Sequence, residues 1–153
     1  MELFSNLSSE EIQKLHDAPA QVTVLVAGAD GNIDPKEIAA AEKVTQIRSF
    51  SYHEVMKSFY ETVNADFQET LDQLISELPA DLEERQAELS SRLTQLNPIL
   101  AKLDHHIARL FYETLLSLAS HVAKASGGII GMFTINNEEK KVIELPMITP
   151  IVD

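Results

Sequence analysis

The sequence contains no cysteine, which excludes disulfide bridges, thiolate metal sites and cysteine nucleophiles. It also lacks any run of about 18 apolar residues, the length that a transmembrane helix needs. The closest approach, 110–123, is interrupted by Glu113 and His121. The first four residues, MELF, show neither the basic region nor the apolar region of a signal peptide. We therefore expect a cytoplasmic protein, which can still lie beside a membrane through a partner.

Basic residues are scarce. The chain has 12 lysines and arginines against 24 acidic residues, a formal net charge of −12. The imbalance is concentrated between Glu54 and Glu88, where ten acidic residues stand against two basic ones, a local charge of −8. Such a surface repels phosphate backbones, so no nucleic-acid partner is expected. It is compatible with cations or a basic protein partner, and equally with a solvated face that only keeps the protein soluble.

The length and composition predict a single domain over residues 1–153, large enough to bury a core. Apolar residues recur at helical spacing along most of the chain, and no segment alternates cleanly with a period of two. The sequence therefore predicts an all-α fold, a helical bundle of about eight helices. Their expected bounds are 8–17, 19–29, 34–48, 51–63, 64–78, 81–97, 98–126 and 138–145.

Several of these bounds come from residues that favour helix ends. Ser8 and Glu11 have the spacing of a capping box, which predicts a helix start. Pro19 suits the first turn of a second helix, where the missing N–H group is not needed. Pro98 is expected to begin the longest helix in the same way, and Pro146 and Pro150 are expected to bracket an extended tail.

The segment Ala29–Glu37, with the sequence ADGNIDPKE, lies between two predicted helices and carries the carboxylates of Asp30, Asp34 and Glu37. One interpretation is a plain helix-to-helix junction, in which Asp34 caps the next helix and Glu37 completes a capping box. The other is a site for a hard divalent cation of the Ca²⁺ or Mg²⁺ class, held by these three carboxylates. The helix-to-helix junction interpretation gives roles to Asp34 and Glu37, and it explains the presence of Asp30 least.

A comparison with the calcium-binding helix–loop–helix loop supports only half of such a site. That loop takes oxygen ligands from its first, third, fifth and ninth positions and an acid at its twelfth. With Glu37 at the twelfth position, Asp34 and Asp30 fall on ligand positions. Val26 and Gly28 fall on the first and third, and neither offers a side-chain oxygen.

A weaker copy of the segment occurs near the other end of the chain. Residues 26–31 (VAGADG) match 122–127 (VAKASG), and 33–37 (IDPKE) match 135–139 (INNEE) after an insertion. This match predicts a duplicated helix–loop–helix unit, so that two related halves form the bundle. Glu139 corresponds to Glu37, whereas Ser126 and Asn136 replace the other two carboxylates.

The pattern of an apolar helix followed by A-D-G-x-I-D-P-x-E resembles the tellurite-resistance protein B (TerB) family and its TerB-like relatives. The resemblance covers most of the chain, strongly at the first motif and more loosely at the second. It implies an all-helical bundle with internal two-fold similarity and divalent metal binding by Asp30, Asp34, Glu37 and Glu139. It also implies a link to tellurite resistance, stress response and membrane-associated complexes.

The sequence thus predicts a non-enzymatic interaction module, stress-associated and TerB-like, that binds a divalent metal ion weakly and acts through a protein partner. The sequence is compatible with a homo-oligomer but does not decide the oligomeric state. The apolar stretch 129–133 either folds back on the core or presents a surface to the partner. The main alternative is a purely structural, scaffolding helical protein with no ion site. An enzyme that uses Asp30 and Glu37 as paired carboxylates is less favoured.

Overall fold

The computed structural model describes residues 4–29, 33, 35–48, 54–125 and 142–151. Within these residues it contains seven helices and no strand, which confirms the all-α class. The helices are α1 (Ser9–Ala27), α2 (Pro35–Arg48), α3 (Glu54–Ala65), α4 (Phe67–Glu77), α5 (Leu82–Thr94), α6 (Leu96–Leu100) and α7 (His105–Ala125). The prediction of about eight helices is not confirmed, and the two related halves stay a prediction because the second loop lies outside the described residues.

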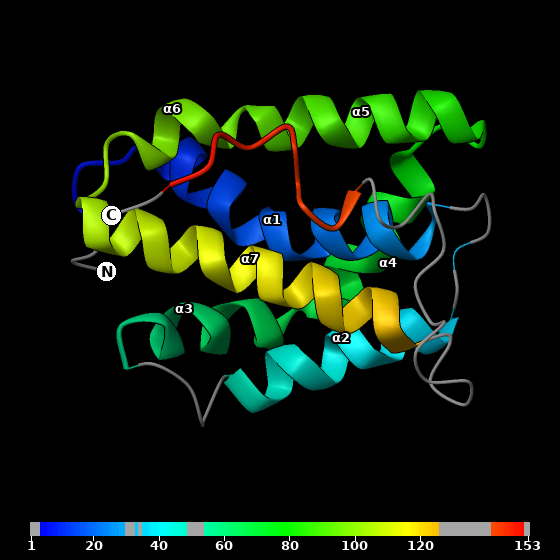
Figure 1. The fold of residues 1–153 in the computed structure, drawn as a ribbon. Coiled ribbons are helices and arrows are strands. Elements are labelled where there is room, and N and C mark those ends of the chain that lie inside the picture. The colour runs from blue at the N-terminus through cyan, green and yellow to red at the C-terminus, as the bar shows by residue number, and fades with distance from the viewer. Residues whose placement is uncertain (1–3, 30–32, 34, 49–53, 126–141, 152–153) are drawn as a thin grey trace.

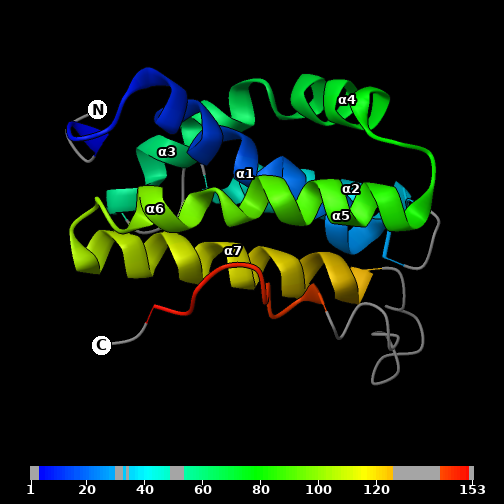
Figure 2. The same cartoon turned by 90° about the horizontal axis from the view of Figure 1, so that it is seen from above.

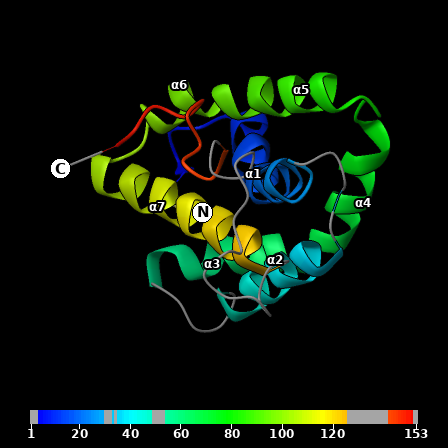
Figure 3. The ribbon, with the colours of Figure 1, turned by 45° about the vertical axis from the view of Figure 1, so that its right-hand side comes forward.

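Helix α1 is the centre of the fold. It contacts each of the other six described helices, and Figure 3 shows it enclosed by them. Its second half is apolar nearly all round, so Val22, Val24 and Leu25 are completely buried. A helix with this pattern is expected in the interior of a bundle. Its start is the predicted capping box, since Ser8 Oγ accepts from Glu11 N at 3.1 Å and Glu11 Oε1 accepts from Ser8 N at 2.9 Å.

The prediction that Pro19 begins a second helix is wrong, because Pro19 lies inside α1. A proline within a helix costs about 3 kcal/mol, since it removes one backbone hydrogen bond and crowds the preceding turn. Burial of both flanking halves offsets this cost. Leu15 before the proline and Val22 after it are fully buried, and each such side chain contributes about 1.5–3 kcal/mol. A single continuous helix brings both into the same core.

The long C-terminal helix begins at His105 and not at Pro98, which is a second correction. Pro98 lies in the short helix α6, and a turn at residues 101–103 separates α6 from α7. Asp104 explains the later start. Its carboxylate accepts from His106 N at 3.0 Å and its carbonyl accepts from Ala108 N at 2.9 Å. Aspartate is a strong N-cap residue because it satisfies these otherwise unpaired N–H groups.

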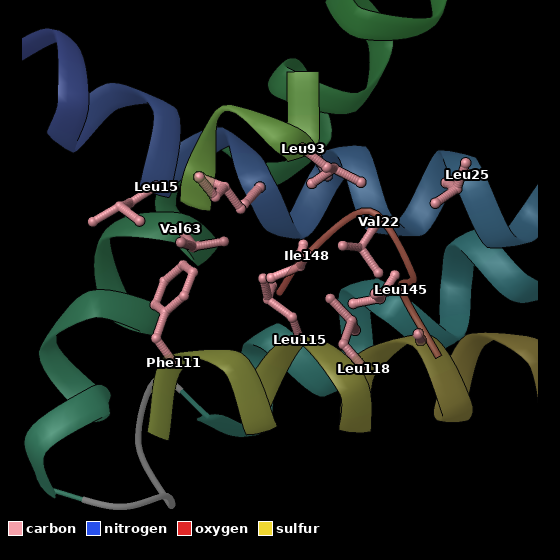
Figure 4. Packing of buried hydrophobic residues seen from close by; sticks show 14 of the residues in the cluster. Leu15, Val22, Leu25, Val63, Leu93, Phe111, Leu115, Leu118, Leu145 and Ile148 are labelled. Carbon is pink, nitrogen blue, oxygen red and sulfur yellow. The ribbon is translucent and has the colours of Figure 1, made fainter. Parts of the chain in front are cut away.

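The C-terminal segment 142–151 lies against the helices. Figures 1 and 2 show it running alongside α7, and Figure 4 shows Leu145 and Ile148 among Val22, Leu115 and Leu118. Leu145 and Ile148 are completely buried. The predicted helix 138–145 begins outside the described residues. Its described part ends at Val142, earlier than predicted, because a turn at 143–144 leads into Leu145, whose φ is 47°.

Asn97 fixes this segment at its far end. Its amide nitrogen donates to the Met147 carbonyl oxygen at 3.1 Å, and its amide oxygen accepts from Thr149 N at 2.8 Å. The predicted extended tail is therefore part of the folded core. Among the described helices, none is both long enough and apolar enough to cross a bilayer.

Candidate functional site

The predicted metal-binding segment is described only in part. Asp30, Asp34 and Glu139 lie outside the described residues, as does the apolar stretch 129–133. Glu37 is described. It lies in the first turn of α2, and its side chain is only 1 % exposed. The convergence of the carboxylates therefore stays a prediction, whereas the inward position of Glu37 is a structural fact.

Two backbone hydrogen bonds form the end of α1, just before Asp30. Gly28 N donates to Val24 O at 2.9 Å, and Ala29 N donates to Val26 O at 3.2 Å. Gly28 and Ala29 are both buried, so the chain leaves the helix inside the protein. Buried carbonyl groups at a helix end need hydrogen-bond donors from elsewhere.

Helix α5 supplies those donors. The guanidinium of Arg85 donates to the Gly28 carbonyl oxygen at 2.8 Å, and the side-chain amide of Gln86 donates to the Leu25 carbonyl oxygen at 3.2 Å. Arg85 is only 7 % exposed. A positive charge at the C-terminal end of a helix is stabilising, because the carbonyl groups there carry partial negative charge. The junction is thus held by protein groups on the α1 side.

The role of Arg85 was missed from the sequence. It is one of the two basic residues between Glu54 and Glu88, the most acidic part of the chain. A signal was present in the spacing, since Arg85, Leu89 and Leu93 are four residues apart and share one helix face. All three are buried in the structure. An arginine in register with buried leucines indicates an inward-facing cation.

This arrangement limits what the junction can do with a metal ion. The Gly28 and Leu25 carbonyl groups already accept hydrogen bonds, and the guanidinium beside Gly28 repels a cation. Within the described residues, no group of three histidine or carboxylate side chains is placed to hold a metal ion. Any cation at this junction must therefore depend on the carboxylates of segment 30–37.

The other end of α2 carries a second buried cation. Arg48 is 4 % exposed and donates to Tyr60 Oη at 2.9 Å, Thr114 O at 3.0 Å and Ser117 Oγ at 3.0 Å. Its guanidinium carbon also lies 5.0 Å from the centre of the Tyr60 ring, a cation–π contact. These contacts join α2 to α3 and α7, so Arg48 has a structural role.

No family model, curated protein or solved structure matches this chain. The TerB resemblance is therefore carried by the sequence motif alone.

Proposed function

We propose that this protein is a non-enzymatic, TerB-like interaction module that binds a divalent cation weakly at the junction between α1 and α2. Asp30, Asp34 and Glu37 supply the carboxylate oxygens, and waters complete the coordination. Calcium and magnesium both favour oxygen ligands of this kind. Glu139 provides the equivalent carboxylate of the second, weaker copy.

The burial of Glu37 is the observation that carries the proposal. Glu37 is buried in the first turn of α2, three residues after Asp34 and seven after Asp30 in the sequence. An inward-facing carboxylate so close to two others is a natural ligand for a hard cation. The guanidinium of Arg85 at the end of α1 accounts for weak affinity.

The same Arg85 contact favours the structural alternative, in which the junction binds no ion. Arg85 and Gln86 satisfy carbonyl groups at the end of α1 without any metal. In that case Asp34 acts only as the N-cap of α2. Asp81 offers a matched comparison, because it caps α5 by accepting from Glu84 N at 3.0 Å.

Thermal unfolding during titration with Ca²⁺, Mg²⁺, Mn²⁺ or Zn²⁺ distinguishes the two. A cation at about 100 times its Kd raises the free energy of unfolding by about 2.7 kcal/mol. We expect this stabilisation in the wild type and in Asp72→Asn, which removes an exposed carboxylate from α4, and its loss in Asp30→Asn. A wild type whose melting temperature is unchanged by millimolar cation contradicts the metal site.

The capping alternative has its own result. If Asp34 only caps α2, Asp34→Ala and Asp81→Ala should each lower the free energy of unfolding by about 1 kcal/mol. The cost should be the same with and without cations. A cost for Asp34→Ala that grows with cation concentration, while that of Asp81→Ala does not, supports coordination.

The biological part of the proposal is a cytoplasmic role in tellurite resistance and stress response through a protein partner. It is supported by the A-D-G-x-I-D-P-x-E motif. Tellurite-sensitive bacteria that produce the wild-type chain should survive tellurite better than those producing Asp30→Asn at equal protein level. Equal survival counts against this role without affecting the metal titration.

A further inference from the structure

A polar cleft of about 370 Å³ lies where α1, α4 and α5 meet, away from the α1–α2 junction. This volume falls within the range of small-ligand sites. Helix α1 packs against both α4 and α5, which flank it in Figure 3. The cleft is lined by Gln13, Asp17, Gln21, Asp66, Thr70, Gln73, Leu74, Glu77 and Arg92.

Most of the lining comes from one face of α1 and the facing side of α4, and α5 adds Arg92. Gln13, Asp17 and Gln21 follow one another at intervals of four residues, so they share a face of α1. Asp66, at the start of α4, and Glu77, at its end, bound the facing stripe. Arg92 of α5 is the only arginine or lysine of the lining. Gln13 is exposed and Asp17 is half-buried, so this face of α1 opens to solvent along the cleft.

Most charges of the cleft have partners. Asp66 Oδ1 lies 2.9 Å from His16 Nε2. Arg92 Nε bonds Glu88 Oε2 at 2.7 Å, and its NH1 lies 3.9 Å from Glu77 Oε1. The guanidinium therefore lies between two carboxylates, whose negative charges offset its own, so it attracts an anion only weakly.

Asp17 differs from the other acids of the cleft. Within the described residues its carboxylate accepts one hydrogen bond, from the neutral amide of Gln13 at 2.9 Å. The side chain is half-buried, and burial raises its pKa above the usual value because the charged form loses water. The Asp17 carboxylate is thus partly desolvated on the cleft wall and forms no ion pair within the described residues, although the charges of His16 and Arg92 partly offset the effect of burial on its pKa.

Gln21 lies one helical turn further along the same face and is only 8 % exposed. Its side-chain amide makes no hydrogen bond within the described part of the chain, although it lines the cleft. Its polar atoms still reach solvent in the cleft, because Gln21 has no atom among the fully buried side-chain atoms that lack a partner in the described residues. Asp17 and Gln21 therefore offer neighbouring acceptors that no protein group uses fully.

We propose that this cleft binds a small organic cation with N–H donors, an alkylammonium or guanidinium group, which donates to Asp17 and Gln21. The acceptors on the cleft wall exceed the donors, which suits a ligand that donates. A divalent metal ion fits less well, because the described residues place no three carboxylate or histidine side chains together. This site does not depend on the function proposed above.

The test uses butylammonium and methylguanidinium as probes, with binding to the full chain followed by NMR chemical-shift titration. Tetramethylammonium has the same charge but no N–H donor. We expect saturable binding of at least one probe below about 10 mM, the affinity that a few charged hydrogen bonds supply. Tetramethylammonium should bind at least about tenfold more weakly, since it loses those hydrogen bonds.

Two variants and one control complete the design. Asp17→Asn should weaken probe binding by about tenfold or more. Asp72→Asn is the matched control for Asp17→Asn. Gln68 donates to Asp72 at 2.9 Å on α4, just as Gln13 donates to Asp17 on α1, but Asp72 lies outside the cleft. Gln21→Leu should weaken binding with little change in stability, since the Gln21 amide makes no hydrogen bond within the described residues and reaches solvent through the cleft. If the Gln21 amide were needed only for folding, Gln21→Leu would lower stability and leave probe binding unchanged.

Three results overturn the proposal. The first is the absence of saturable binding by both probes. The second is equal affinity for tetramethylammonium, which means that only the negative charge of the protein acts. The third is an equal loss of binding in Asp17→Asn and Asp72→Asn.

Discussion

The guanidinium of Arg85 donates a hydrogen bond of 2.8 Å to the carbonyl oxygen of Gly28, a residue 57 positions earlier in the chain. The contact ties α5 to the end of α1, where the acidic segment begins. Gly28 has an ordinary φ of −100°, so its lack of a side chain serves this close approach. A Cβ atom built on Gly28 would lie 2.8 Å from the Arg85 NH2 atom and 3.1 Å from Val24 O.

Gly28→Ala should therefore destabilise the protein. Alanine makes the unfolded chain less flexible, which by itself raises the free energy of unfolding by about 0.4–1 kcal/mol. Its methyl group would also displace Arg85, and overpacking of this kind typically costs more than that gain. We expect a net loss of about 1–2 kcal/mol in the free energy of unfolding, measured by urea denaturation.

A double-mutant cycle separates the clash from other effects. In an Arg85→Ala background the added methyl group has nothing to displace except the Val24 carbonyl, so Gly28→Ala should cost less. The coupling should be at least about 0.5 kcal/mol. Additive losses would show that Arg85 moves aside freely and that the Gly28 contact contributes little.

Arg48→Met should destabilise the bundle by removing the contacts that join α2 to α3 and α7. Tyr60 Oη, Thr114 O and Ser117 Oγ each lose a charged donor. We expect a decrease of about 1.5–3 kcal/mol in the free energy of unfolding, measured by urea denaturation. Arg48→Lys should restore only part of it, because an ammonium group lacks the planar fork that reaches several acceptors.

Arg92→Met is the surface control for Arg48→Met. Arg92 pairs with Glu88 at 2.7 Å, but its side chain is 31 % exposed. Exposed ion pairs contribute about 0–1 kcal/mol, so its loss should be small. Equal effects of the two variants would contradict the structural role of Arg48.

Asn97→Ala should loosen the C-terminal segment from the helices. The variant removes both the donor to Met147 O and the acceptor for Thr149 N. Hydrogen exchange should then accelerate at the amides of Ile148 and Thr149, and stability should fall by about 1–3 kcal/mol. Thr149→Ala keeps the backbone N–H group and should change exchange little. Unchanged protection in Asn97→Ala would show that burial of Leu145 and Ile148 alone holds the segment.

Local features of the fold were predictable from the sequence. The Ser8–Glu11 capping box is correct because both of its hydrogen bonds join residues three apart. The all-α class follows from helical spacing in the same way. Pro19 shows where local rules fail. Proline prefers the first turn of a helix, yet long-range burial of Leu15 and Val22 keeps α1 continuous through it.

The contacts that define the α1–α2 junction were not predictable. Arg85 was counted only as one of two basic residues in an acidic stretch, but it donates to a backbone carbonyl 57 residues away. At the other end of α2, Arg48 was not singled out, although it donates to a carbonyl 66 residues away. No local sequence pattern indicates which residues so far apart in the chain will be in contact. Glu37 was chosen as a site residue for its place in the motif, and its burial could only come from the structure. The same holds for the C-terminal segment, whose burial depends on α1 and α7.

Asp17→Asn should change the pH dependence of stability in a direction set by the raised pKa of Asp17. Burial raises this pKa above the ordinary value of 3.8 and outweighs the hydrogen bond from Gln13 and the charges of His16 and Arg92, which lower it. Asp66 adds a smaller increase. The unfolded chain therefore releases this proton at lower pH than the folded protein does. Between the two pKa values the folded state binds more protons, so this group makes stability fall as pH rises. At neutral pH the charged Asp17 is a net cost.

Asp17→Asn removes that cost while its side-chain oxygen can still accept from Gln13. Urea denaturation from pH 3.5 to 7.5 should show a flatter profile for the variant and a gain under about 1 kcal/mol at neutral pH, because solvent screens a half-exposed group. Asp72→Asn removes the same charge from an exposed site and corrects for the general relief of a chain of net charge −12. If both variants gain equally, Asp17 carries no special cost. A larger gain for Asp17→Asn would mean that the native carboxylate is kept at the expense of stability, as expected of a group that binds a ligand.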